Sequence, residues 1–208
     1  MSKKAYFIAG IDTNIGKTIV SAILTEALEA DYWKPIQSGD LTNSDSDKLQ
    51  ALISNSKTTI HPNAYALQEA ASPHYSAALE NIHIDLASIH LPKTENHLIV
   101  EGAGGLLVPL NDKDLLIDCI QNLGIEVILV IKNYLGSINH SLLSIEALKA
   151  RKIPVRGLIF NGPSNAARED YILAYSGLAF LGRIREEKNF DKEKIKEYAK
   201  QFQFLAHD

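Results

Sequence analysis

A glycine-bounded loop that ends in a lysine and a threonine is the stretch of this chain best suited to bind phosphate. The loop runs Gly10-Ile11-Asp12-Thr13-Asn14-Ile15-Gly16-Lys17-Thr18. Glycines let backbone N–H groups turn inward around a polyphosphate, and a following helix N-terminus adds unpaired donors. Lys17 would reach the outer phosphates and Thr18 would ligate Mg²⁺, with Asn14, Ile15 and Gly16 completing the nucleotide contacts. Five residues separate the two glycines, one more than in the usual pattern, so this is a variant loop.

The segments on either side of this loop favour phosphate binding. Ala5 to Ala9 is a short apolar run typical of a buried strand, and Ile19 to Leu28 is rich in Ala, Leu and Ile, as in a helix. Strand, loop and helix in this order are the context in which such a loop binds phosphate. The alternative, a glycine-rich turn with a solvated lysine, explains that context less well.

A carboxylate stands at the end of another predicted strand. Glu101 follows the apolar run 98–100 and precedes Gly102, Ala103 and Gly104. A buried carboxylate is costly unless it is paired or binds a metal, and Mg²⁺ favours hydroxyl, carboxylate, phosphate and water oxygens. Thr18, Glu101 and Asp45 could supply such ligands. Asp45 could instead cap the helix that it begins, and the two roles can coexist.

Two further polar residues follow strand-like segments. Lys34 precedes Pro35, with Ser38 a few residues on, and is either a surface lysine or a functional one. Asn161 precedes Gly162 and could meet the edge of an adenine or form an Asn-Gly turn. The residue pattern alone leaves both alternatives open.

The remaining pattern predicts how these residues are positioned. Strands are expected at 32–35, 97–100, 126–131, 155–160 and 178–184. Helices are expected at 45–53, 85–90 and 115–123 and after residues 72, 137 and 191, and 58–73 is expected to be irregular. The alternation indicates an α/β fold of the phosphate-loop NTPase type. We expect one domain over 1–208, a doubly wound, mostly parallel sheet with helices on both faces. Because ligands bind beyond the carboxyl ends of such strands, the residues above should meet at one sheet edge.

The composition limits the possible partners and compartments. The 208 residues carry a net charge of -4, which gives no reason to expect a nucleic acid or a membrane as partner. No signal-type segment and no transmembrane-length run is present, so we expect a cytoplasmic protein. The single cysteine, Cys119, lies in an apolar, helix-like run and is expected to be a buried structural thiol.

Taken in order, these motifs resemble dethiobiotin synthetase, an ATP-dependent family of biotin biosynthesis in the phosphate-loop class. The resemblance covers most of the chain and includes the five-residue loop spacing. The segments that carry it are 10–18, Trp33-Lys34-Pro35-Ile36-Gln37-Ser38-Gly39, Ser44-Asp45, Ser72-Pro73-His74, Val100-Glu101-Gly102-Ala103-Gly104-Gly105 and Leu135-Gly136-Ser137-Ile138-Asn139-His140. Each motif is weak by itself, but the ordered set is specific.

The resemblance implies an activity, its partners and a role for each residue. The substrates would be 7,8-diaminononanoate, CO₂ or bicarbonate and ATP, with Mg²⁺ as cofactor, in a homodimer. The reaction would be closure of a ureido ring through a carbamate and its mixed anhydride with phosphate. Lys17 and Lys34 would stabilise charge, Thr13 and Ser38 would contact the diamine or carbamate, and Asn161 with Gly162 would meet adenine. Thr18, Asp45 and Glu101 would hold Mg²⁺, while Ser137 and Asn139 would bind the substrate carboxylate.

One segment departs from that family, and two other activities stay open. Where the family commonly has Gly-Glu-Ile-Pro, this chain has Gly182-Arg183-Ile184-Arg185, so its adenine-side loop departs from the family and a looser nucleotide selectivity is expected. One alternative is a partner-regulated switch ATPase of the same fold, although such proteins usually carry a second lysine early in the loop. Another is an amide-forming ligase such as a cobyrinate amidase, which normally needs an ammonia-producing domain.

Overall fold

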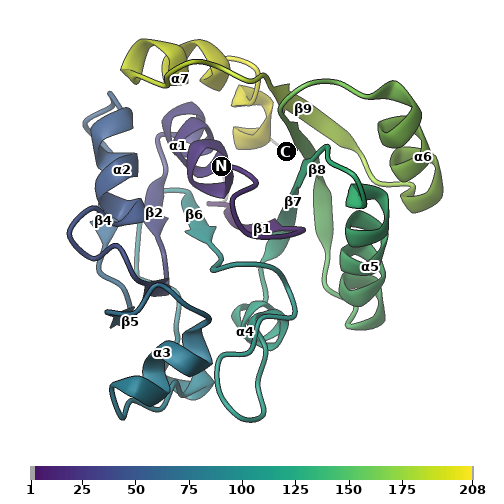
Figure 1. The fold of residues 1–208 in the computed structure, drawn as a ribbon. Coiled ribbons are helices and arrows are strands. Elements are labelled where there is room, and N and C mark those ends of the chain that lie inside the picture. Colours follow the sequence, from purple (N-terminus) through teal and green to yellow (C-terminus); the bar gives the residue numbers. More distant parts are fainter. Residues whose placement is uncertain (1–2, 208) are drawn as a thin grey trace.

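A parallel sheet of seven strands forms the centre of the computed structural model, which describes residues 3–207 (Figure 1). The strand order is β4-β2-β6-β1-β7-β8-β9, and each neighbouring pair is parallel. The bounds are β1 Ala5–Gly10, β2 Asp31–Trp33, β4 Ile60–His61, β6 Leu98–Glu101, β7 Glu126–Lys132, β8 Val155–Asn161 and β9 Phe180–Ile184. A separate parallel pair, β3 (Ile36–Ser38) and β5 (Tyr65–Leu67), lies beside it.

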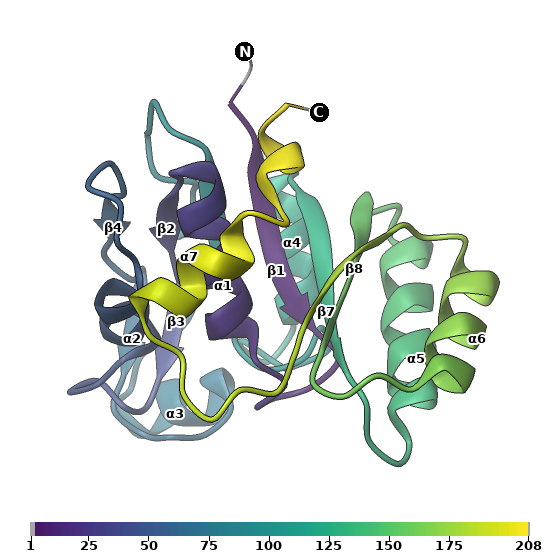
Figure 2. The ribbon, with the colours of Figure 1, turned by 90° about the horizontal axis from the view of Figure 1, so that it is seen from above.

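Helices cover both faces of the sheet, as the sequence predicts. They are α1 Lys17–Leu28, α2 Asp45–Leu52, α3 Pro73–Leu79, α4 Leu116–Leu123, α5 Ser137–Ala150, α6 Ala166–Ser176 and α7 Lys192–Ala199, with 3₁₀ turns η1 Leu86–Ser88 and η2 Gln203–Ala206. Figure 2 shows α1 and α7 on one side of β1 and α4 on the other. Between residues 3 and 207 no helix is both long enough and apolar enough to cross a membrane.

The apolar strands form the core. The β6 strand is buried throughout, and the inner residues of β7 are buried too, which is the pattern of strands covered on both faces. Cys119 of α4 is buried against the same core, as predicted. Burial raises the pKa of its thiol to about 12, so this residue is a structural thiol rather than a nucleophile.

Two predicted segments differ from the structure. The strand expected to end at Pro35 ends two residues earlier, at Trp33, and a second strand, β3, begins directly after the proline. Pro35 lacks an N–H, and its carbonyl accepts from Ala64 and Tyr65 instead of continuing the sheet. The segment 58–73, expected to be irregular, contains β4 and β5. These strands of two and three residues pair with distant segments, so no local period announces them.

The strand register brings the chemical residues to one edge of the sheet. Ile8 of β1 is opposite Glu101 of β6, and Trp33 of β2 is opposite Val100. The phosphate loop after β1 and Lys34 after β2 therefore lie on either side of Glu101. This confirms the expectation that strand ends far apart in sequence meet at one site.

Candidate active site

The glycine-bounded loop leads into a helix whose N-terminus has no protein cap. Gly16 precedes α1 with a φ of 92°, and α1 has neither a side-chain cap nor an acidic residue in its first turn. A Cβ on Gly16 would lie 2.0 Å from Nδ2 of Asn161, so a side chain there would displace the Asn161 amide and strain the backbone at its positive φ. Asn161 donates from the same nitrogen to the Ile15 carbonyl at 2.7 Å and thereby braces the loop. The first N–H groups of α1 are available to an anion.

Lys17 lies against this loop in a desolvated position. Its Nζ donates to the Asp12 carbonyl at 2.9 Å, and the residue is buried. Burial lowers the pKa of Lys17 to about 8, with the charge of Lys34 acting in the same direction and the charge of Glu101 opposing it. An anion beside Lys17 would favour its charged form.

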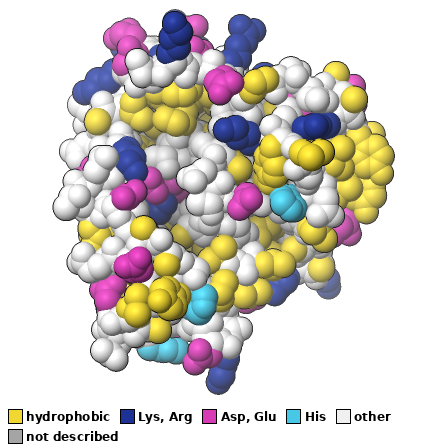
Figure 3. All heavy atoms as spheres, viewed as in Figure 1, with side chains coloured by type: hydrophobic (Ala, Val, Ile, Leu, Met, Phe, Trp, Pro, Cys, Tyr) yellow, Lys and Arg dark blue, Asp and Glu magenta, His cyan; other side chains and the backbone are white. Residues whose placement is uncertain are grey.

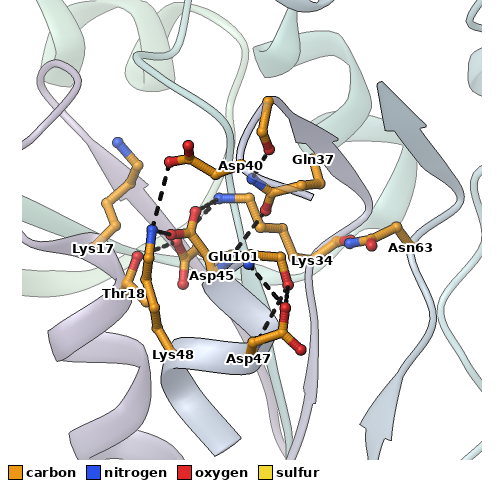
Figure 4. Close-up of polar contacts among 12 residues, drawn as sticks. Lys17, Thr18, Lys34, Gln37, Asp40, Asp45, Asp47, Lys48, Asn63 and Glu101 are labelled. Carbon is orange, nitrogen blue, oxygen red and sulfur yellow. Dashed lines mark hydrogen bonds and ion pairs between the residues drawn. The ribbon is translucent and has the colours of Figure 1, made fainter. Parts of the chain in front are cut away.

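Lys34 lies at the centre of a polar cluster that it forms with Glu101 and Asp45. Its side chain is 6% exposed, and Nζ contacts Glu101 Oε1 at 3.2 Å and the carboxylate of Asp45 (Figure 4). Burial opposes the charge on Lys34, but the attraction of Glu101 and then of Asp45 outweighs it and raises the pKa of Lys34. The lysine is therefore a buried cation, and the surface alternative is wrong.

Asp45 is not the cap of α2, which removes the other alternative left by the sequence. Ser44 is the N-cap: its hydroxyl accepts from the Asp47 N–H, and the Asp47 carboxylate accepts from the Ser44 N–H. Asp45 faces Lys34 instead. Burial raises the pKa of Asp45, but the charge and hydrogen bond of Lys34 outweigh it, so the net pKa lies below the ordinary value.

Thr18, Asp45 and Glu101 form a donor set that fits Mg²⁺. The Thr18 hydroxyl donates to Glu101 Oε1 at 2.9 Å, and both Thr18 and Asp45 line the same cleft as Glu101. One hydroxyl and two carboxylates beside a phosphate loop match the ligands that Mg²⁺ takes together with phosphates and water. Across residues 3–207 no group of three or more His, Cys, Asp or Glu side chains is placed to hold a metal.

Two residues in this cluster were missed by the sequence analysis. Tyr32, fully buried, donates its hydroxyl to Glu101 Oε2 at 2.9 Å; burial and then the charge of Glu101 raise the pKa of Tyr32 well above its usual value. It stands two residues before Lys34, so strand alternation places both on one face and could have identified it. Lys48, one helical turn after Asp45, approaches the other Asp45 oxygen at 3.6 Å.

Two adjoining cavities meet at this cluster. The larger, about 790 Å³, is a cleft along the phosphate loop, α2 and residues 187–190. The smaller, about 510 Å³, is lined by residues such as Gln37, Ser38, Ser72, Ala103 and Val108. Both are lined by Thr13, Asn14, Lys34, Asp45, Lys48 and Gly104. A group held in one cavity could therefore meet a group held in the other at Lys34.

Six of the predicted residues lie outside both cavity linings. Asn161 and Gly162 stand beside the phosphate loop, and Arg183 donates to the Gly162 carbonyl at 3.2 Å. Ser137 and Asn139 are at the start of α5, the first buried and the second exposed. Ile15 and Gly102 are turned into the core: Ile15 is 2% exposed, and a Cβ on Gly102 would meet the Phe7 ring at 2.8 Å.

Comparison with known proteins identifies the family. The family model described as an AAA domain matches residues 4–194. The ATP-dependent dethiobiotin synthetase of Christiangramia forsetii is 51% identical over 96% of this chain and 96% of its own length. The chain belongs to the dethiobiotin synthetase family. Another synthetase, from Cytophaga hutchinsonii, is also 51% identical, over 94% of this chain and 95% of its own length.

The dethiobiotin synthetases are ATP-dependent cyclo-ligases, which agrees with the phosphate loop and with the second cavity beside it. Solved structures of other ATPases share only the fold. The cell division ATPase MinD of Pyrococcus furiosus aligns with a TM-score of 0.63 at 14% identity, covering 99% of this chain and 100% of that one. A ParA family ATPase of Chlorobium tepidum aligns at 0.54 with 13% identity, covering 95% and 98%. The switch-ATPase alternative thus rests on the fold alone.

Proposed function

We propose that this chain closes the ureido ring of dethiobiotin at Lys34, one of the six residues that line both cavities. The observation that carries the proposal is the shared lining of the cleft along the phosphate loop and the cavity beside Ser38. ATP would lie in the first, with its phosphates at the loop, and 7,8-diaminononanoate in the second. Lys34, charged and buried at the junction, would attract the negative charge of both a carbamate and the transferring phosphoryl group.

The bonds change in three steps under this proposal. One amine of the diamine adds to CO₂, loses a proton and becomes a carbamate. A carbamate oxygen then bonds to the γ-phosphorus as the bond to ADP breaks. The second amine attacks the carbonyl carbon and loses a proton, and phosphate leaves with the carbamate oxygen. Thr13 and Ser38 would orient the diamine or carbamate, while Lys17 and Lys34 would hold the phosphoryl group in line.

Mg²⁺ would be held by Thr18, Asp45 and Glu101. The ion supplies charge neutralisation to the phosphates when it is bound. Tyr32 fixes the Glu101 carboxylate from the side away from Thr18 and Lys34, through its other oxygen. Asn161 and Gly162, next to the phosphate loop, remain candidates for the edge of the adenine.

The component requirement for phosphate release tests this proposal. The phosphoryl acceptor does not exist until diamine and CO₂ have combined, so we expect rapid phosphate release only with 7,8-diaminononanoate, bicarbonate and MgATP together. Each is left out in turn, and phosphate is measured continuously. Hydrolysis of ATP that is indifferent to the diamine would overturn the proposal and favour a switch ATPase.

We also propose that the active form is a homodimer. An apolar groove of about 400 Å³, lined by residues that include Leu106, Leu107 and Leu143, runs past Thr13. Leu107 is 55% and Leu143 60% exposed, and Figure 3 shows hydrophobic side chains gathered on the lower part of this face. A second copy seated there could bring its Ser137 and Asn139 to the substrate carboxylate.

The dimer is expected to dissociate when a charge is placed in this groove. Leu143→Asp should be monomeric by light scattering at micromolar concentration and should lose most turnover, because a carboxylate cannot be desolvated in an apolar contact. Phe204→Asp, an equally drastic change at an exposed residue of η2, is the matched control and should stay dimeric. A monomeric wild-type protein with full activity would refute the dimer.

A further inference from the structure

The loop between β9 and α7 forms one wall of the ATP cleft. Residues 187–190 line the cleft together with Ala51 and Leu52 of α2 and Ile19 of α1. Figure 3 shows hydrophobic side chains gathered beneath α7 on this part of the face. With the triphosphate at the phosphate loop and the diamine cavity on the far side of Lys34, this end of the cleft is left for the nucleoside.

This loop has few bonds of its own to the rest of the protein. Among the described residues, 186–190 make no backbone–backbone hydrogen bond outside regular elements, and Lys188 and Asn189 are exposed. Such a loop is preorganised for a ligand only if contacts from another element of the protein hold it in place.

Tyr198 of α7 supplies these contacts. Its hydroxyl accepts from the Arg185 N–H at 3.2 Å and donates to Glu187 Oε1 at 2.6 Å. Its ring is 6% exposed and lies 6.1 Å from the Phe190 ring, centroid to centroid. One side chain therefore contacts the loop at three points: before the part that lines the cleft, at the first residue of that part and at its last.

We infer that Tyr198 is a positioning residue for nucleotide binding, which holds the 185–190 loop against the nucleoside end of the cleft. This inference rests on the proposed placement of ATP. Tyr198 itself does not line the cleft and acts through Glu187 and Phe190. Glu187 keeps one carboxylate oxygen outside the bond with Tyr198, and such an oxygen can accept from an amino or ring N–H group of a base.

Removal of the Tyr198 hydroxyl tests the inference. Tyr198→Phe retains the buried ring and deletes both hydrogen bonds. We expect the Kd for MgADP, measured by isothermal titration calorimetry, to rise about 5- to 10-fold, in line with the loss of one or two hydrogen bonds. The KM for ATP should rise in parallel, while kcat and the KM for 7,8-diaminononanoate stay within twofold.

Tyr65→Phe is the matched control. The Tyr65 hydroxyl also joins a backbone N–H, that of Asp85, to a side-chain oxygen, that of Ser88, but Tyr65 lines neither cavity. Both variants lose comparable hydrogen bonds, and only Tyr198→Phe should weaken MgADP binding. An unchanged Kd in Tyr198→Phe, or equal weakening in both variants, would overturn the inference.

Glu187→Ala tests the same inference without changing the buried Tyr198, in case Tyr198→Phe fails to fold. It removes the acceptor from a loop outside the core and should raise the Kd for MgADP in the same direction. In the double variant, Tyr198→Phe should add less than it does alone, because both changes release the same loop. Full additivity would contradict a role through Glu187. ADP binding needs neither diamine nor bicarbonate, so this result is independent of whether the proposed ring closure is right.

Discussion

Replacing Lys34 by alanine is expected to lower turnover by about 100-fold or more while MgATP still binds. Stabilisation of developing charge by one well-placed group is typically worth about that factor. The phosphate loop and Lys17 are left intact, so the Kd for MgADP should change little. The measurements are phosphate release under full substrate and calorimetric titration with MgADP.

The thermal stability of Lys34→Ala must be measured together with its activity. Without Lys34, Glu101 stays buried with only neutral donors, Thr18 and Tyr32, and breaking a buried pair costs about 3–5 kcal/mol. A lower thermal midpoint is therefore expected, and activity is compared well below it. Lys57→Ala, which removes a surface ion pair with Glu29, serves as control and should leave both properties unchanged. Turnover of Lys34→Ala within threefold of wild type would contradict the role given to this lysine.

Glu101→Gln is expected to impair the Mg²⁺-dependent reaction as strongly. The amide keeps the shape of the side chain: its one oxygen can accept from one of the two hydroxyls, Thr18 or Tyr32, and its NH₂ group can donate to the other. It lacks the negative charge that attracts a divalent ion. We expect a fall in turnover of at least about 100-fold and a higher Mg²⁺ concentration for half-maximal rate, because several kcal/mol of charge stabilisation depend on the ion. Phosphate release is measured across a Mg²⁺ titration.

A second buried carboxylate provides the control for that variant. Glu169 is 6% exposed and pairs with Arg183, outside both cavities. Glu169→Gln should lower stability without changing the Mg²⁺ requirement. If Glu101→Gln shows the wild-type Mg²⁺ profile, Glu101 is not a ligand.

The residues of the site that follow long strands could be predicted from the sequence. Apolar runs in the sequence predict the strands that lead to the loop after β1 and to Glu101 at the end of β6, and the parallel topology then requires both at one edge. Lys34 and Asp45 stayed ambiguous, because their exposure depends on the register of β2 and on Ser44 capping α2. Both features depend on the folded structure, and no local sequence pattern predicts them.

Other parts of the structure had no usable sequence signal. The β4 and β5 strands are too short to show a period, and their partners lie elsewhere in the chain. The 185–190 loop is polar and irregular. Its Arg185, which donates to the Tyr198 hydroxyl, lies 13 residues before Tyr198 in the sequence and outside the helix that contains Tyr198. The sequence predicts a helix after residue 191, which contains Tyr198, but no local pattern singles out the hydroxyl group of that residue. The Tyr198 hydroxyl has its role only because the 185–190 loop passes beside it in the folded structure.

The oxygen atoms of bicarbonate test the central claim most directly. In the component assay, ¹⁸O-labelled bicarbonate is supplied with unlabelled water, and the released phosphate is analysed by mass spectrometry after a short reaction. If a carbamate oxygen attacks the γ-phosphorus, each phosphate should carry one ¹⁸O atom, and the ureido carbonyl of the product should retain the other. Unlabelled phosphate formed together with ADP and the cyclic product would contradict the account, because the oxygen would then have come from water.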